Sequence, residues 1–180
     1  MYPFLRLARV AAAARRRPPL ALDQESELRL RCWPIDLDMF GEMNNGRVLT
    51  LCDLGRFDHF IRSGVLAASR RRGWGFAVAG VSARYRRRVR AFEPIRLLTR
   101  PLGRDARFFY VHQAMEVRGR PASSVLVRAA CTRPAAKAGG GLVETDAVMA
   151  ALGRPDWRPE LPGWVAAWAE AEAARPWPPG

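Results

Sequence analysis

The sequence predicts an α+β domain in which an antiparallel sheet accompanies one long helix. Apolar residues recur at helical spacing through residues 45–62, directly after a polar, turn-rich stretch. Four runs with strand-like alternation follow, at 80–89, 93–103, 106–117 and 121–132. Only short links separate these runs, and short links make consecutive strands antiparallel neighbours.

The chain begins with a basic extension at 1–26. Residues 1–22 contain no acid and carry five arginines around apolar side chains, which predicts an amphipathic helix. We expect this helix to pack on its own domain or to make weak contact with a membrane surface. The arginines interrupt the apolar stretch, so it lacks the pattern of a secretory signal, and no window is apolar enough to span a bilayer.

The main domain is expected at 27–135, because 180 residues suffice for one core but not for two. Its first strand is predicted at 27–33, where polar and apolar residues alternate, and residues 69–80 are predicted to be a loop that feeds the next strand. Residues 136–180 form a C-terminal extension with a short helix at 144–153 and a Pro- and Trp-rich tail.

The formal net charge is +13, and Lys137 is the only lysine. Two explanations of this charge are equally good. The composition is simply arginine-rich without functional meaning, or the charge attracts an anionic partner. Nucleic acid is not expected as that partner, because the arginine runs lack interleaved aromatic residues. In the run 80–89, Arg84, Arg86 and Arg88 share one face, which is either a solvated outer side or a phosphate-binding strip.

Three widely spaced cysteines without a CxxC pair indicate a reducing compartment, so we expect a cytoplasmic protein. The two histidines, His59 and His112, have no cysteine or carboxylate at a metal-ligand spacing. A metal site is therefore not expected.

The segment 36–56 reads DLDMFGEMNNGRVLTLCDLGR. It resembles the D-x-D-x-x-G-H-x-N-N motif of the 4-hydroxybenzoyl-CoA thioesterase-like family. With the strand runs that follow, it is most similar to the branch of thioesterase superfamily member six and its bacterial relatives, over residues 27–170. The resemblance implies a hot-dog fold, in which an antiparallel sheet wraps around one long central helix.

The resemblance also implies an acyl-CoA thioesterase with Asp38 as the catalytic carboxylate, either as nucleophile or as general base. The backbone N–H of Asn45 would stabilise the oxyanion, which fits the unpaired amides and positive dipole end of a helix N-terminus. Asn44 and Asn45 are equally well explained as helix-capping and turn residues. Asp36 is expected to orient the loop or cap the helix.

Two positions depart from the family pattern. Glu42 stands where histidine is common, and Val48 stands where tyrosine is common. The sequence thus leaves two functions open: a thioesterase, or a catalytically silent protein that binds acyl-CoA or acyl carriers. In either case Glu42, Asn44 and the three arginines of 80–89 are candidate substrate contacts, and CoA enters as part of the substrate rather than as a cofactor.

A hot-dog dehydratase is disfavoured, because such an enzyme needs an active-site histidine paired with an acid. Oligomerisation is expected, because a single curved sheet around one helix leaves apolar edges and faces exposed. A homodimer or homotetramer would cover them.

Overall fold

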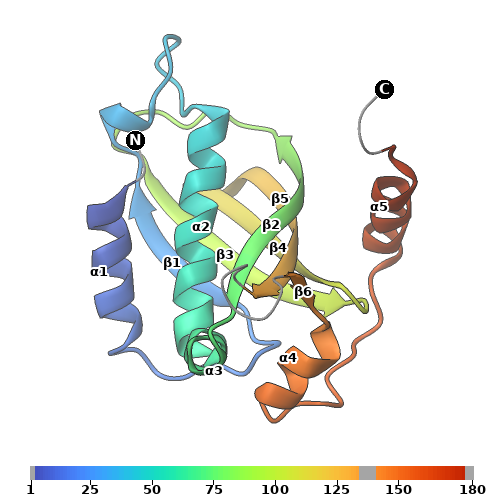
Figure 1. The fold of residues 1–180 in the computed structure, drawn as a ribbon. Helices are drawn as coiled ribbons and strands as arrows, with labels where there is room; N and C mark the ends of the chain where they lie inside the picture. Colours follow the sequence, from blue (N-terminus) through green and yellow to red (C-terminus); the bar gives the residue numbers. More distant parts are fainter. Residues whose placement is uncertain (1–2, 134–140, 177–180) are drawn as a thin grey trace.

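The computed structural model describes residues 3–133 and 141–176. Its helices are α1 (Phe4–Ala14), the 3-10 turn η1 (Pro34–Asp36), α2 (Asn45–Arg62), α3 (Val65–Arg72), α4 (Thr145–Ala151) and α5 (Gly163–Ala174). Its strands are β1 (Ser26–Arg31), β2 (Gly75–Tyr85), β3 (Pro94–Arg104), β4 (Phe108–Val117), β5 (Arg120–Arg133) and β6 (Gly141–Val143). Figure 1 shows the sheet curving around α2, the α+β arrangement that the sequence predicts.

The strands pair antiparallel in the order β1-β3-β4-β5-β2. β6 pairs with the end of β5, where Val143 lies opposite Cys131. Among the described residues β1 and β2 are therefore the edge strands of this path, and β2 runs alongside α2 with one side unpaired.

The long helix is confirmed at its predicted bounds, and the strand runs after residue 93 are confirmed within a few residues. Two expectations were wrong. The stretch at 69–80 is not all loop, because Val65–Arg72 is helical after Gly64, whose left-handed φ of 79° starts the turn. The strand expected at 80–89 begins at Gly75 and ends at Tyr85, because the next two N–H groups both donate to Ala122 C=O and end the ladder.

The main core lies between α2 and the concave face of the sheet. Leu51 and Leu54 of α2 pack there against Leu97, Met115 and side chains of β5. At the tightest point α2 carries Gly55, where a Cβ would stand 2.7 Å from Thr99 Oγ1. Glycine is therefore what allows the helix to approach the sheet this closely.

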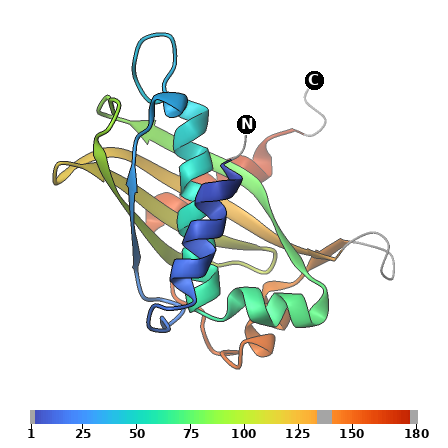
Figure 2. The same cartoon turned by 90° about the vertical axis from the view of Figure 1, so that its left-hand side faces the viewer.

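Both terminal extensions pack on this domain. α1 lies beside α2 and buries Val10 and Ala14 (Figure 2), which confirms the expected helix and its packing. α5 lies on the opposite side of the sheet from α2, where Val165 is buried against Tyr110 and Leu126. The outer face of β4 and β5 is thus covered by the same chain.

Candidate functional site

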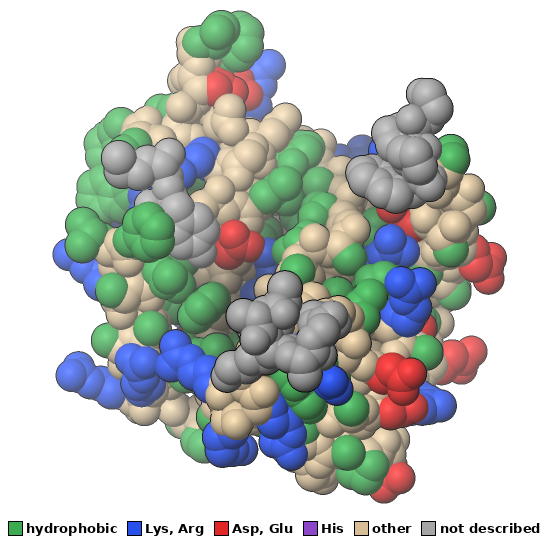
Figure 3. All heavy atoms as spheres, viewed as in Figure 1, with side chains coloured by type: hydrophobic (Ala, Val, Ile, Leu, Met, Phe, Trp, Pro, Cys, Tyr) green, Lys and Arg blue, Asp and Glu red, His purple; other side chains and the backbone are tan. Residues whose placement is uncertain are grey.

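The segment between η1 and α2 is a narrow hairpin that projects beyond the sheet (Figures 1 and 2). Leu37 and Met43 form an isolated antiparallel bridge at its base. Inside it, Asp38 N–H donates to Glu42 C=O at 2.8 Å, and Asp38 Oδ1 accepts from Phe40 N–H at 2.9 Å. Through this second bond, one carboxylate oxygen of Asp38 shapes the turn, as aspartate commonly does. Figure 3 shows hydrophobic side chains gathered at the tip of the hairpin.

The first turn of α2 follows directly. Asn44 is its N-cap, and its side-chain oxygen accepts from Gly46 N–H at 2.8 Å, so the capping interpretation of Asn44 is correct. Asn45 is the first helical residue, and its N–H donates to no group among the described residues. This amide is available to an oxygen that approaches the helix end.

Asp36 fixes the position of the hairpin. Its carboxylate is completely buried and accepts from Arg6 at 2.8 Å and from Trp33 N–H at 2.9 Å, with Arg47 at 3.3 Å. Its backbone C=O accepts from Asn44 N–H at 2.9 Å. Asp36 therefore ties α1 and α2 to the loop, the orienting role expected for it, and Arg6 is a contributor that the sequence did not indicate.

A cavity of about 220 Å³ opens at this helix end. It brings together four of the predicted site residues: Glu42, Asn45, Arg86 and Arg88. Asp38 is not part of its lining in the single chain, although its hairpin partner Glu42 is.

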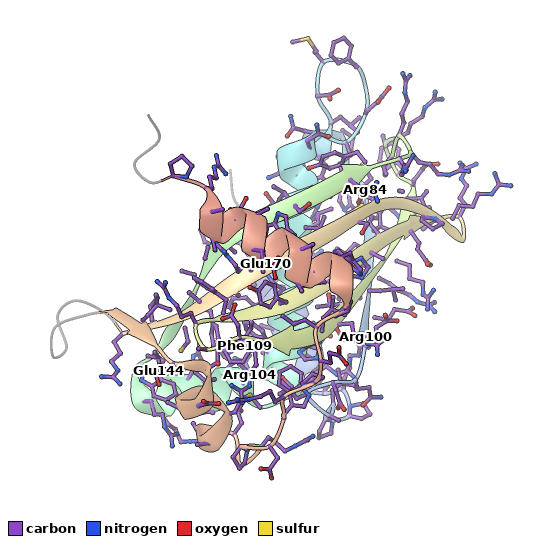
Figure 4. The ribbon with its side chains drawn as sticks, turned by 90° about the vertical axis from the view of Figure 1, so that its right-hand side faces the viewer. Arg84, Arg100, Arg104, Phe109, Glu144 and Glu170 are labelled. Atoms are coloured by element: carbon purple, nitrogen blue, oxygen red, sulfur yellow. The ribbon has the colours of Figure 1, made fainter. Side chains whose placement is uncertain are left out.

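Arg84 lies apart from this cavity. It immediately precedes Tyr85, which lines the cavity, so its side chain leaves the opposite face of β2. Figure 4 labels it on the side of the sheet that carries α5. Arg86 and Arg88 reach the cavity because they lie in the loop after β2, not because they share a strand face with Arg84.

Two cavity residues were missed by the sequence analysis. Tyr85 O–H donates to Asn45 C=O at 3.5 Å, and burial raises the pKa of this phenol. Ser123 is 5% exposed, and its hydroxyl has no hydrogen-bond partner among the described residues. A buried hydroxyl without a partner is costly, and it indicates a position where a ligand atom can bind. Nothing in the local pattern around Ser123 marks it, because its position depends on the pairing of β5 with β2.

Two further cavities lie farther along α2 and β2, and together we call them the apolar groove. A cavity of about 210 Å³ has Leu49, Val78 and Val81 in its lining, and the next one, of about 470 Å³, is lined by Phe57, Leu66 and Trp74 among others. Asp53 and Arg56 line both cavities, so the two adjoin. The groove is lined mainly by apolar side chains, and Asp53 and Arg56 are the charged residues that its two parts share.

Asp53 and Arg56 form an ion pair across one turn of α2, and Arg56 donates to buried Gln113 at 2.5 Å. Burial raises the pKa of Asp53, and the Arg56 charge opposes this effect. The neighbouring Cys52 is not a candidate nucleophile, because burial raises the pKa of its thiol to about 12. No group of three or more metal-ligating side chains is placed to share an ion within the described ranges.

A family model described as the thioesterase-like superfamily matches residues 32–169, which is most of the chain. The chain belongs to the thioesterase-like superfamily. Among curated proteins of similar sequence, Protein THEM6 from Xenopus laevis is 40% identical over 111 residues, which are 61% of this chain and 54% of that protein. The chain spans about half the length, or less, of the curated relatives it matches.

Solved structures confirm the hot-dog fold expected from the motif. YbaW, a probable thioesterase from Escherichia coli, superposes with a TM-score of 0.64 at 14% identity, over 71% of this chain and 96% of that one. A variant of 4-hydroxybenzoyl CoA thioesterase in complex with 4-hydroxybenzoyl CoA superposes with a TM-score of 0.63 at 12% identity, over 71% and 97% of the two chains. At these identities the likeness shows the fold.

Within this thioesterase-like chain, the two departures from the motif have visible structural consequences. Glu42 pairs with Arg88 at 2.9 Å, so a carboxylate and a guanidinium occupy the cavity mouth. Val48 is buried and presents no hydroxyl, while Tyr85 brings a hydroxyl to the same cavity from β2.

Proposed function

We propose that this chain hydrolyses acyl-CoA thioesters to the free acid and CoA. The observation that carries the proposal is the cavity at the N-terminus of α2, where the Asn45 amide lies near the Ser123 hydroxyl, which has no hydrogen-bond partner among the described residues. The apolar groove lies farther along the same helix. Family membership and the binding of a CoA ester by a structural neighbour support the same substrate class.

In the proposed complex the acyl chain occupies the groove beside α2, and the thioester carbonyl lies at the helix end. The Asn45 N–H then faces the oxygen that becomes negative when the carbonyl is attacked, and the positive end of the helix dipole stabilises it further. Arg86 and Arg88, which line the cavity, are the proposed contacts of the CoA phosphates, because guanidinium groups bind phosphate through paired hydrogen bonds. Asn44 contributes by capping the helix that carries the amide.

Asp38 is the proposed catalytic carboxylate. Its Oδ1 accepts hydrogen bonds within the hairpin, and its Oδ2 has no hydrogen bond to a described group. This second oxygen is available either to attack the carbonyl or to activate water. Hydrolysis by the second route transfers the water proton to Asp38 and then to the CoA thiolate as the C–S bond breaks.

We propose a homodimer, or a homotetramer built from it, as the working assembly. The edge strand β2 exposes Val78, Val81 and Tyr85, which are 50%, 39% and 41% exposed, and Val81 and Tyr85 belong to the groove and the cavity. A second copy along β2 would cover these side chains and enclose the substrate channel.

The three cysteines are free and buried, which supports a reducing, cytoplasmic setting. Among the described residues, no helix combines the length and the apolarity needed to cross a bilayer.

The alternative is a silent protein that binds acyl-CoA or acyl carriers. It is favoured by one observation: Asp38 does not line the cavity of the single chain. Both proposals require the same groove, so substrate binding does not distinguish them. Turnover does.

The test compares hydrolysis of short-, medium- and long-chain acyl-CoA by the wild-type protein and by Asp38→Asn, with Asp156→Asn as the matched control. Asp156 is exposed and far from the hairpin in the chain. We expect Asp38→Asn to lower kcat by about a hundredfold or more, with CoA-ester binding retained and the control unchanged. Binding without turnover by the wild type at every chain length would establish the silent alternative, and full activity in Asp38→Asn would remove Asp38 from the mechanism.

A further inference from the structure

An apolar surface lies at the end of the molecule beyond the N-terminus of α2, outside the cavity. Its members are large side chains between 47% and 91% exposed: Leu5, Trp33, Ile35, Met39, Phe40 and Phe92. We call this surface the end face. None of these six side chains lines the cavity or the groove described above.

The six members of the end face come from four segments, which printed contacts hold together at this end of the molecule. The rings of Trp33 and Phe92 meet edge to face with centroids 6.0 Å apart, and Phe92 N–H donates to Cys32 C=O at 2.7 Å. The hairpin is joined to the same loop, because Met43 N–H donates to Val89 C=O at 2.8 Å. The Arg6–Asp36 ion pair holds the start of α1 beside η1.

Phe92 is held outward at a cost in backbone energy. Its φ of 64° is in the left-handed region, where a residue with a Cβ is strained. Phe92 is nevertheless 54% exposed, so the isolated chain gains only part of the possible burial from this conformation. Strain that presents an aromatic ring to solvent indicates a contact outside the chain.

The charge around the end face is cationic. Arg86, Arg87 and Arg90 are exposed in the loop that ends at Phe92. Three of the four acids at this end are neutralised or buried: Glu42 pairs with Arg88 at 2.9 Å, Glu93 pairs with Arg118 at 3.1 Å, and Asp36 is buried with its arginines. The fourth, Asp38, is half-buried at the hairpin and has no ion pair among the described residues. Exposed aromatic and aliphatic side chains bordered by arginines are the combination that binds anionic lipid surfaces.

We propose that the end face docks on the surface of an anionic lipid bilayer. Met39 and Phe40, which are 91% and 78% exposed at the tip of the projecting hairpin, enter the interfacial region, and the arginines of the loop lie at the headgroups. The tip is convex, so its side chains can enter a fluid lipid headgroup region more readily than they can pack against a flat protein surface. The cavity that contains Glu42 and Arg86 then lies at the membrane side of the protein.

This surface differs from the membrane contact that the sequence predicts for the basic N-terminal segment. Most of α1 packs against α2, and only its first turn contributes to the end face, through Leu5. The proposal does not depend on thioester hydrolysis, because vesicle binding is measured without substrate.

The test measures co-sedimentation of the full chain with vesicles of phosphatidylcholine alone and of phosphatidylcholine mixed with phosphatidylglycerol. We expect binding to the anionic vesicles that weakens as salt is added. The variant Met39→Ser/Phe40→Ser should bind about tenfold less tightly, and Arg87→Gln/Arg90→Gln should lose a similar factor.

Matched controls change the same chemistry elsewhere. Leu142→Ser/Trp164→Ser removes two exposed apolar side chains from β6 and α5, and Arg70→Gln/Arg71→Gln removes two charges from the last turn of α3. Both controls should bind like the wild type. Equal losses in the control variants would show that vesicle binding is not specific to the end face and would overturn the proposal. The same holds if Met39→Ser/Phe40→Ser leaves vesicle binding intact, or if it lowers the oligomer mass in light scattering, which would mean that a second copy covers the end face.

Discussion

Arg6 and Asp36 form a buried ion pair at 2.8 Å between the N-terminal helix and the loop that carries the candidate carboxylate. The Asp36 side chain is completely buried, and that of Arg6 is 18% exposed. A basic extension outside the predicted domain is therefore part of the structure that holds the site.

Arg6→Ala should lower the free energy of unfolding by about 3 kcal/mol, because it removes one partner of a buried carboxylate that then depends on Arg47 and one backbone N–H. Urea denaturation measures the loss. Arg9→Ala, an exposed arginine on the same helix, serves as the control and should change little. Equal effects of the two substitutions would show that the pair adds nothing beyond general charge.

Asn45→Pro tests the proposed oxyanion amide directly. Proline is tolerated at the first helical position, and the preceding Asn44 is already extended with ψ of 137°. The substitution removes the backbone N–H together with the asparagine side chain. We expect kcat for acyl-CoA hydrolysis to fall by about a hundredfold, with little change in stability. Asn45→Ala keeps the N–H and should stay close to the wild type. If both variants lose activity alike, the side chain rather than the amide is responsible.

Gly55→Ala should destabilise the fold by about 2 kcal/mol or more. The new methyl group would stand 2.7 Å from Thr99 Oγ1 and 2.8 Å from Leu97 Cδ2, so α2 must move away from the sheet. Gly163→Ala is the matched control, because a Cβ there meets nothing within 4 Å, and it should be neutral or slightly stabilising. Thermal unfolding of the two variants provides the comparison, and a Gly55→Ala protein as stable as the wild type would contradict the close packing.

His59 should make stability depend on pH. Burial lowers its pKa, and its Nε2 contacts Gln24 C=O at 3.1 Å, so the buried ring is neutral. The unfolded chain binds the proton near pH 6.5, whereas the folded chain binds it only at lower pH. Stability is therefore expected to fall as the pH decreases below about 6.5. The denaturation midpoint is measured for the wild type and for His59→Gln between neutral and mildly acidic pH. The midpoint of His59→Gln should fall less steeply with decreasing pH than that of the wild type. Parallel midpoint-against-pH curves for the two proteins would exclude this histidine as the cause. His112, whose pKa burial also lowers, should contribute to the decline that remains.

The sequence by itself determined the order of the main elements apart from α3, the bounds of α2 and the motif-bearing loop, because these follow from local periodicity, turn residues and capping chemistry. Asn44 is a case in point, since its capping bond to Gly46 joins residues two apart in the chain. Family membership was likewise available from the segment 36–56, where the specific residues are adjacent.

Only the tertiary structure decided which side chains share a cavity. Ser123 reaches the Asn45 helix end through the pairing of β5 with β2, and Arg6 reaches Asp36 because α1 packs on α2. Arg84 was separated from Arg86 and Arg88 because β2 ends at Tyr85, a boundary set by bonds to Ala122 and not by the alternation of the run. Such contacts join residues that are tens of positions apart, and no local pattern in the chain records them, because their geometry is fixed only when the sheet closes around α2.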